Sequence, residues 1–370
     1  HKKMKIARVQ PYGTLAYPPT GTNSIALDSY QLALRQAASH EVIFYGNQVP
    51  WLKEVEYRDE VGIRYRGFKS SIDHIIKALK ILDRLRIVNP KRPIFASKFY
   101  YPGYITKIAK DIRSQECHLA HIHNYPQYAC TSKAFNPTIK TVLHMHCEWL
   151  TQLDHNLIKE YLKDIDLVIG VSDFITSKIK KAFPHIAERC HTVWNCTDFV
   201  STTKRKNYLK EGKYKQLLFV GRISPEKGIH ILIEAFSKVV HRYPEAQLKI
   251  AGPDLIMSHE YGLDLKEDDP HLKTLAPFYS KSYRSYLQSQ IASLGLADSV
   301  SFLGSIAHFK LAEIYNAADI LISPSIWEEP FGLGVIEAMA MGLPVIATQG
   351  GAYPETIEVG QTGLLVERNN

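Results

Sequence analysis

The feature that most limits how this chain can fold is an alternation of short apolar runs with helix-like segments, which occurs twice. In the first half, a helix-like segment covers residues 24–39, and the apolar runs are residues 5–9, 41–45, 119–123, 141–145 and 166–172. In the second half, the apolar runs are residues 216–221, 247–252, 300–304, 320–325 and 344–348, and helix-like segments cover residues 225–242, 282–294, 309–318 and 334–341. Continuous apolar runs of this length are typical of parallel strands covered on both faces. The alternation therefore predicts an α/β protein built from βαβ units.

The alternation is interrupted once, by the polar stretch STTKRKNYLKEGKYK at residues 201–215. Because polar stretches between periodic segments join domains, we expect one doubly wound, Rossmann-like domain at residues 1–200 and a second at residues 201–370. The length of 370 residues, with 45% apolar and 22% charged residues, is that of a globular protein with about two domains.

The sequence shows no signal for insertion into a membrane or for export. No apolar run approaches the ~20 residues that a membrane-spanning helix needs. The basic start HKKMKIARVQPYG leads into a strand without the cleavage region of a signal peptide. Five cysteines form no C-x-x-C pair. We therefore expect a cytoplasmic protein with reduced cysteines.

The positive charge of the chain is concentrated in residues 71–110, which carry nine basic and two acidic residues within a total net charge of +8. Apolar residues recur there at helical spacing, at positions 75, 76, 79, 82 and 85. An amphipathic helix with a solvated basic face explains this pattern. Weak peripheral contact with the anionic inner face of a membrane explains it equally well, so both interpretations stay open.

The stretch GRISPEKG at residues 221–228 directly follows an apolar run. Ser224 is a good N-cap and Pro225 a good first helical residue, so the stretch predicts a helix that begins there. The free N–H groups of that helix start, together with Arg222 and Lys227, would form a phosphate site. Two exposed loop charges are the alternative. The pattern G-x-x-x-x-G-K-[ST] is absent, which argues against a P-loop NTPase.

The stretch EEPFGLGVIEAMAMGLPV at residues 328–345 places Glu337 inside a helix that is apolar nearly all round. A buried carboxylate is costly unless it is paired or hydrogen-bonded. Because helical side chains lean toward the N-terminus, Glu337 could reach a ligand there and accept two hydrogen bonds from a vicinal diol such as that of ribose. Glu329 could accept hydrogen bonds from sugar hydroxyls. A structural ion pair of Glu337 with an arginine or lysine is the alternative.

Together these segments resemble the retaining glycosyltransferases of family four. The stretch EEPFGLGVIEAMAMGLPVIATQGGAYPE (328–355) is similar to the family signature, in which seven residues separate two glutamates. FVGRISPEKGIHILIEAF (219–236) resembles the strand, loop and helix that bind the diphosphate, and VIGVSDFI (168–175) and NCTD (195–198) resemble interdomain segments. The resemblance implies the GT-B fold, in which two Rossmann-like domains face each other across a cleft and a nucleotide sugar binds mainly to the second.

The resemblance implies roles for individual residues of the second domain. Arg222 and Lys227 match the residues that bind the diphosphate. Glu337 matches the ribose binder, and Glu329 matches the glutamate near the donor sugar. The segment that lines the sugar and the phosphates with its backbone corresponds to Phe331, Gly332 and Leu333.

In the first domain, PPTGTNS (18–24) resembles the loop that closes over the diphosphate, with Gly21 and Thr22 where the family usually has two glycines. VLHMHCEW (142–149) resembles the strand end where the family places a histidine near the reacting sugar. His146 fits that role best. The competing histidines are His144, His121 and His123.

The resemblance further implies transfer of a sugar from a nucleotide diphosphate sugar, with UDP favoured by family frequency, to a hydroxyl acceptor with retention of configuration. The acceptor would be a glycan, a lipid-linked saccharide or a small glycoside. Because Arg222 and Lys227 would stabilise charge on the leaving diphosphate, we expect no metal requirement. The D-x-D formed by Asp164 and Asp166 lies where a helix ends and a buried strand begins, and we interpret it as structural. We expect no nucleic-acid partner.

Two other classes of function stay open at this point. A nucleotide-sugar epimerase or a phosphorylase could use the same fold, although the seven-residue glutamate spacing argues against both. A non-catalytic protein that binds sugar nucleotides is the other alternative, although the complete set of cations and glutamates argues against it. Members of the family usually continue beyond the position of Asn370 with helices, so we expect either further chain or a missing tail.

Overall fold

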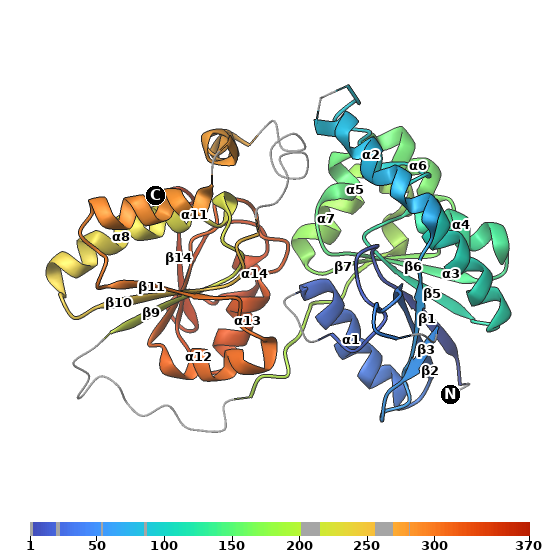
Figure 1. Ribbon diagram of the computed structural model, residues 1–370, viewed down its shortest axis with the longest axis horizontal. Coiled ribbons are helices and arrows are strands. Elements are labelled where there is room, and N and C mark those ends of the chain that lie inside the picture. Colours follow the sequence, from blue (N-terminus) through green and yellow to red (C-terminus); the bar gives the residue numbers. More distant parts are fainter. Residues whose placement is uncertain are drawn as a thin grey trace. The chain divides into compact units, whose positions relative to one another are not determined.

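The computed structural model describes residues 3–19, 23–52, 55–84, 87–200, 215–255, 269–280 and 282–370. The chain divides into two compact units, His1–Trp194 and Asn195–Asn370 (Figure 1). Each unit contains one sheet of mainly parallel strands with helices packed against it. The prediction of an α/β protein with two doubly wound sheets is therefore confirmed.

The sheet of the first unit has eight strands in the order β3-β4-β2-β1-β5-β6-β7-β8. Neighbouring strands are parallel, except that β3 pairs with β4 in the antiparallel sense. The strands are β1 (Lys5–Val9), β2 (Glu41–Asn47), β3 (Glu56–Arg58), β4 (Arg64–Phe68), β5 (Leu119–His123), β6 (Lys140–Met145), β7 (Leu167–Gly170) and β8 (Cys190–Thr192).

Helices cover the sheet of the first unit and bury its apolar residues. One core cluster joins Phe44 of β2 and Tyr65 of β4 to Ala33 of α1. The helices are α1 (Ser24–Ala37), α2 (His74–Arg84), α3 (Pro102–Ser114), α4 (Gln127–Phe135), α5 (Trp149–Gln152), α6 (His155–Leu162) and α7 (Asp173–Ala182), with 3-10 turns η1 (Ser71–Asp73), η2 (Ile94–Ala96) and η3 (Pro184–Arg189).

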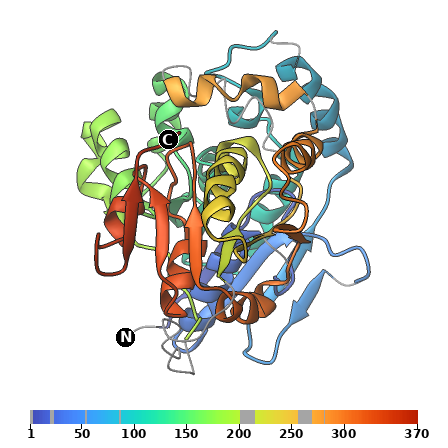
Figure 2. The same ribbon diagram turned by 90° about the vertical axis from the view of Figure 1, so that its left-hand side faces the viewer.

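The sheet of the second unit has six strands, all parallel, in the order β11-β10-β9-β12-β13-β14. Figure 2 shows β12, β13 and β14 of this sheet in orange to red. The strands are β9 (Gln216–Val220), β10 (Gln247–Ala251), β11 (Val300–Gly304), β12 (Ile320–Ser323), β13 (Val345–Thr348) and β14 (Gly363–Val366).

Each face of the second sheet has its own apolar core, because residues alternate between the two faces along a strand. On one face, Leu217 and Phe219 of β9 pack with α8 and α11. On the other, Leu218 of β9 packs with residues of α12 and α13. Figure 1 shows α8 and α11 on one side of this sheet and α12 and α13 on the other. The helices are α8 (Ile229–Arg242), α10 (Pro270–Lys273), α11 (Tyr283–Ser293), α12 (Leu311–Ala317), α13 (Leu333–Ala340) and α14 (Tyr353–Thr356), with 3-10 turns η4 (Pro225–Lys227), η5 (Ala276–Ser280) and η6 (His308–Lys310).

The strand order fixes where a ligand can bind in each unit. Counted in chain order, the second sheet reads 3-2-1-4-5-6, the order of a dinucleotide-binding fold, and the order reverses between β9 and β12. In the first sheet the corresponding reversal lies between β1 and β5. Ligands of open α/β sheets bind beyond the carboxyl ends of the strands at such reversals. A ligand site is therefore expected at the residues that follow β9 and β12 in the second unit and β1 and β5 in the first.

Candidate active site

The two cations predicted to bind phosphate, Arg222 and Lys227, lie in the loop that follows β9. Nη2 of Arg222 donates to Oε1 of Glu226 at 3.1 Å. Nζ of Lys227 donates to Oε1 of Glu329, which follows β12, at 2.5 Å. The structure thus brings Lys227 and Glu329 together across the reversal of strand order. Each cation is held by a carboxylate, and both carboxylates are buried.

The carboxylates that hold these cations are themselves anchored by hydroxyl groups. Glu226 accepts hydrogen bonds from Ser224 at 2.6 Å and from Tyr279 at 3.1 Å. Glu329 accepts one from Ser325 at 2.5 Å. Burial alone would raise the pKa of Glu329, but the charge of Lys227 and hydrogen bonds to the carboxylate outweigh it and lower the pKa below its usual value. Glu329 is therefore ionised at neutral pH.

The helix predicted to begin at Pro225 begins four residues later, so that expectation was wrong. Residues Pro225–Lys227 form a 3-10 turn, and α8 begins at Ile229 after Gly228. Gly228 has a φ of 71°, a left-handed conformation that interrupts the helical hydrogen bonds. Ser224 consequently bonds Glu226 with its side chain instead of capping a helix. Lys227 therefore lies in the turn that precedes α8.

Two loops of this site pack backbone against backbone through glycine. A Cβ atom at Gly228 would overlap the carbonyl oxygen of Pro324, in the loop after β12. A Cβ atom at Gly351, which has a φ of 61°, would overlap the backbone of Glu329. Because Gly351 follows β13, the loops after β9, β12 and β13 are fixed relative to one another.

The buried Glu337 on α13 is paired with a histidine and a tyrosine, not with the arginine or lysine considered from the sequence. Its Oε1 lies 2.6 Å from Nε2 of His308, and its Oε2 accepts a hydrogen bond from the Tyr315 hydroxyl at 2.8 Å. Glu337 is 3% exposed. Burial, and then the charge of Glu337, raise the pKa of Tyr315 above its usual value. Tyr315 is therefore protonated at neutral pH and donates its hydroxyl hydrogen to Glu337.

Of the two glycine-containing loops predicted to line the donor, the structure describes one and leaves the glycine of the other outside the described residues. Gly332 directly precedes α13, Leu333 is its first residue, and Phe331 is buried beside them. A side chain at Gly332 would overlap the ring of Tyr353. Gly21 and Thr22 lie outside the residues that the structure describes.

The aspartates of the D-x-D make structural contacts. The Asp166 carboxylate binds Lys133 at 2.9 Å and the backbone N–H of Thr141 at 2.9 Å. The backbone carbonyl of Asp164 accepts a hydrogen bond from the Thr141 hydroxyl at 2.6 Å. Asp166 thus ties the start of β7 to β6 and α4, in agreement with the structural interpretation.

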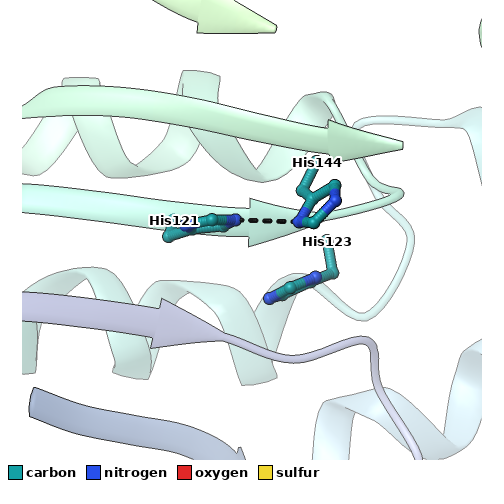
Figure 3. A group of neighbouring side chains, drawn as sticks. All are labelled: His121, His123 and His144. Atoms are coloured by element: carbon teal, nitrogen blue, oxygen red, sulfur yellow. Dashed lines mark hydrogen bonds between the residues drawn. The ribbon is translucent and has the colours of Figure 1, made fainter. Parts of the chain in front are cut away.

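Four histidines gather at the carboxyl ends of β5 and β6 in the first unit. His121 and His123 belong to β5, His144 belongs to β6, and His146 directly follows β6. Nε2 of His121 lies 3.2 Å from Nδ1 of His144 (Figure 3). Nδ1 of His123 lies 2.8 Å from Nε2 of His146. Burial is the main reason that the pKa of each ring is lowered, for His146 to about 3. All four rings are therefore neutral at pH 7.

The buried cation Arg8 on β1 adjoins this cluster. Its Nη2 lies 3.5 Å from Nε2 of His123, and its Nε donates to Ser29 on α1 at 3.0 Å. The ligand atoms of His121, His123 and His144 lie within 4.8 Å of one another, as those around a metal ion do. A divalent cation beside the guanidinium would add charge of the same sign in a buried place. The arrangement therefore fits a neutral hydrogen-bonded cluster better than a metal site.

Solved structures with a similar fold come from glycosyltransferases. A sucrose-phosphate synthase from Thermosynechococcus elongatus matches with a TM-score of 0.70 and 20% identity, over 100% of this chain and 87% of that one. The Anabaena protein HepE, solved with UDP and glucose, matches with a TM-score of 0.63 and 18% identity, over 99% and 86% of the two chains. These likenesses, with the observed sheets, define the fold of the chain as GT-B.

Sequence comparison identifies the family within that fold. The model described as Glycosyltransferase Family 4 matches residues 29–200, and the model described as Glycosyl transferases group 1 matches residues 200–370. The chain therefore belongs to the family-four glycosyltransferases.

Individual relatives are more distant. YtcC of Bacillus subtilis is 28% identical over 72% of this chain and 64% of its own, so the match spans less than two thirds of that protein. The lipopolysaccharide 1,2-N-acetylglucosaminetransferase of Salmonella typhimurium is 24% identical over 94% of this chain and 81% of its own.

Several residues at these sites escaped prediction from the sequence. Glu226 and Tyr279 orient Arg222, and His308 and Tyr315 hold Glu337. Some of these residues lie far in sequence from the motifs, and the others are of a common type. No spacing in the sequence therefore identifies them. Arg8 is different, because a charge in the middle of the apolar run KIARV must be buried once that run is a covered strand. That signal was visible in the sequence.

Proposed function

We propose that this protein transfers a sugar from a nucleotide diphosphate sugar to a hydroxyl group of an acceptor, with retention of the anomeric configuration. The observation that carries the proposal is the contact of Lys227 with Glu329 at the reversal of strand order in the second sheet. It puts a cation suited to a phosphate beside a carboxylate suited to sugar hydroxyls, at the place where this fold binds nucleotides.

Arg222 and Lys227 would bind the diphosphate and stabilise the negative charge that grows on it as the sugar departs. Both side chains are oriented in advance by buried carboxylates, so little reorganisation accompanies the reaction. The charge of each cation is balanced by its carboxylate, and the diphosphate would compete with Glu226 and Glu329 for it. In this proposal the two cations do the work for which other transferases use a divalent metal ion.

Glu337 would hold the ribose without giving up its present partners. A carboxylate has about four positions at which it can accept a hydrogen bond. His308 and Tyr315 occupy one on each oxygen, which leaves one on each for the two hydroxyls of a vicinal diol. The two protein contacts fix the carboxylate plane and orient the remaining lone pairs.

The proton of the acceptor hydroxyl would pass to the leaving phosphate oxygen, because retention lets the acceptor approach on the face from which the diphosphate departs. Glu329 would accept hydrogen bonds from the donor sugar, and the backbone of Phe331, Gly332 and Leu333 would line the sugar and phosphates. His146 would contact the reacting sugar, as the family resemblance implies. Gly21 and Thr22 would complete the diphosphate contacts.

The donor base and the acceptor class complete the proposal. UDP is supported by HepE, which has been solved with UDP and glucose. A glycan, a lipid-linked saccharide or a small glycoside would serve as acceptor. A membrane-linked acceptor would agree with the basic segment 71–110 and with the exposed Ile72 and Ile75 at its start.

The deciding experiment is incubation of the purified chain with radiolabelled UDP-, GDP- and ADP-sugars, with and without a membrane extract as a source of acceptor. We expect one donor to be consumed only when acceptor is present, and NMR of the product to show the anomeric configuration of the donor. Interconversion of donor sugars without acceptor would indicate an epimerase instead. Formation of a sugar phosphate with added phosphate would indicate a phosphorylase, and binding without turnover would indicate a non-catalytic protein.

A further inference from the structure

Arg8 is a fully buried cation in the central strand of the first sheet, and its surroundings dictate which hydrogen bonds it can make. Its Nε donates to Ser29 and its Nη1 donates to Gln36 at 2.9 Å, both on α1. Asp28 on the same helix is also buried, and its charge favours the protonated guanidinium. The remaining nitrogen, Nη2, lies 3.5 Å from Nε2 of His123.

The guanidinium determines which ring nitrogen of His123 carries the proton. A guanidinium donates hydrogen bonds and cannot accept them, so Nε2 of His123 must present its lone pair to Arg8. The ring is neutral, because burial, and then the neighbouring histidines and Arg8, lower its pKa well below the usual value. A neutral imidazole carries one proton, which for His123 must then be on Nδ1.

The proton position on His123 in turn sets the direction of its hydrogen bond with His146. Nδ1–H of His123 points at Nε2 of His146 at a distance of 2.8 Å, so Nε2 of His146 is an acceptor. We propose that Arg8, acting through His123, holds His146 in a single neutral tautomer with its ring proton on Nδ1. The opposite polarity would put a proton on Nε2 of His123, directed at the N–H groups of Arg8.

The tautomer decides what His146 can do in the reaction, a consequence that rests on the proposed function. In the described part of the chain, Nδ1 of His146 makes no hydrogen bond to protein, and the ring is half-buried. The atom left for a ligand is therefore an N–H donor. His146 would donate a hydrogen bond to an oxygen of the sugar and would not accept the proton of the attacking hydroxyl.

Other titratable groups face the same place and do not reverse this polarity. His121 and His144 are neutral and bond each other (Figure 3). A carboxylate oxygen of Asp28 lies within 4.8 Å of a ring nitrogen of His144 and of His146. Burial raises the pKa of Asp28 to about 6 despite Arg8. An ionised Asp28 can only accept hydrogen bonds, so it too favours a proton on the nitrogen of His146 that His123 does not engage.

Long-range ¹H–¹⁵N NMR of the full chain, labelled with ¹⁵N-histidine, tests the proposal without any donor or acceptor. The His146 signal is assigned from its loss in His146→Asn. We expect one neutral tautomer, protonated at Nδ1, in the unmodified protein at pH 7. A His146 ring protonated at Nε2, or a charged ring, would overturn the proposal. An inactive protein that shows the Nδ1–H tautomer would refute the proposed function and still support the relay.

Variants of the two relay residues separate a polarity effect from a packing effect. Arg8→Met removes the donor and should give a mixture of His146 tautomers. His123→Gln keeps an acceptor toward Arg8 and a donor toward His146, so it should preserve the Nδ1–H signal, whereas His123→Phe should lose it. The last two variants leave Arg8 in place and serve if Arg8→Met does not fold. An unchanged His146 signal in both Arg8→Met and His123→Phe would overturn the relay.

Kinetics supply a second readout. We expect Arg8→Met and His123→Phe to lower kcat roughly tenfold, because part of the population lacks one oriented donor whose full loss costs ~10²-fold. UDP affinity, which in the proposed function depends mainly on residues of the second unit, should change little. His123→Gln should recover most of the lost kcat. Equal kcat losses in His123→Gln and His123→Phe would show that the residue is needed for packing alone.

Discussion

At the scale of single residues, the two paired cations carry the sharpest expectation. Arg222→Ala and Lys227→Ala should each lower turnover by ~100-fold or more, because in the proposed function each cation stabilises charge on the leaving diphosphate. Arg242→Ala and Lys273→Ala, at exposed positions of the same unit, are matched controls and should leave turnover unchanged. Activity that survives both site substitutions and disappears with EDTA would assign the charge stabilisation to a metal ion.

Glu337 offers a test of ribose binding that also separates the carboxylate from its partners. Glu337→Ala should weaken UDP binding by about 1–3 kcal/mol, measured by calorimetry, because a charged acceptor of two hydrogen bonds is lost. Tyr315→Phe removes one protein contact of that carboxylate and keeps the carboxylate itself, so its effect on UDP affinity should be smaller. Equal affinities in unmodified protein and folded Glu337→Ala would remove Glu337 from the site.

Prediction from the sequence succeeds at residues whose type is unusual for their surroundings and fails at those that merely hold them. Lys227 and Glu329 were expected at one site from their positions after strands, and the structure brings them into contact. The position of Glu337 in an apolar helix predicted that its carboxylate has a partner. The identity of that partner, His308, depends on how η6 packs against α13, and no local pattern in the sequence encodes that packing.

At the scale of secondary-structure elements, the exposed side chains of α2 and of the turn before it bear on whether the protein contacts a membrane. Ile76 is buried, whereas Ile75, also of the expected apolar set, is 59% exposed, so part of that set points to solvent. Ile72, in the turn before α2, is 58% exposed. Leu79 and Leu82 are half-buried, and Leu85 lies outside the described residues. Exposed isoleucines within a segment of net positive charge would suit an anionic bilayer, where each basic residue contributes ~1 kcal/mol.

Vesicle sedimentation tests this surface. We expect salt-sensitive binding of the full chain to anionic vesicles and none to neutral vesicles. Replacing Ile72 and Ile75 by serine should weaken the binding, because it removes the apolar side chains that would enter the interface. Val359→Ser, at an exposed position of the second unit, is the matched control. Absence of binding to anionic vesicles at low salt would leave the charge to solubility or to a soluble anionic acceptor.

The central strands of both sheets were predicted well, because their residues are buried on both faces. Continuous apolar runs gave the central strands β1, β5, β9 and β10 within one residue of their observed ends. The edge strand β3 and its neighbour β4 were missed, because Glu56, Arg64 and Arg66 make ion pairs there in place of apolar packing. The start of α8 was misplaced because the helical pattern continues through Gly228, whose left-handed backbone is set by contact with another loop.

At the scale of the whole molecule, the buried histidines make the first unit sensitive to acid. The pKa values of four histidines, at positions 121, 123, 144 and 146, are lowered in the folded state, chiefly by burial. Below the unfolded pKa of ~6.5, these histidines gain protons in the unfolded chain but stay neutral in the folded chain. The stability they contribute is complete above pH 6.5 and is lost as the pH falls toward their folded pKa values, by up to ~1.4 kcal/mol per pH unit for each ring.

Urea unfolding followed by limited proteolysis measures this effect for each unit separately. We expect the midpoint of the first unit to fall steeply between pH 7 and pH 5. The second unit, where burial lowers the pKa of His230 to about 4, should respond less. His123→Gln removes one titrating ring from the cluster and should flatten the slope of the first unit. A midpoint independent of pH would show that the rings gain protons in the folded state as easily as in the unfolded state.

The glycine contacts at Gly228 and Gly351 have a consequence for protein engineering. Because the loops after β9, β12 and β13 touch backbone to backbone, an insertion in any of them would displace the other two. Loop grafting, the usual way to change the ligand that a scaffold binds, is therefore not expected to work at these three connections. Libraries that aim at a new donor should vary side chains at fixed loop length, and surviving clones should retain glycine at both positions.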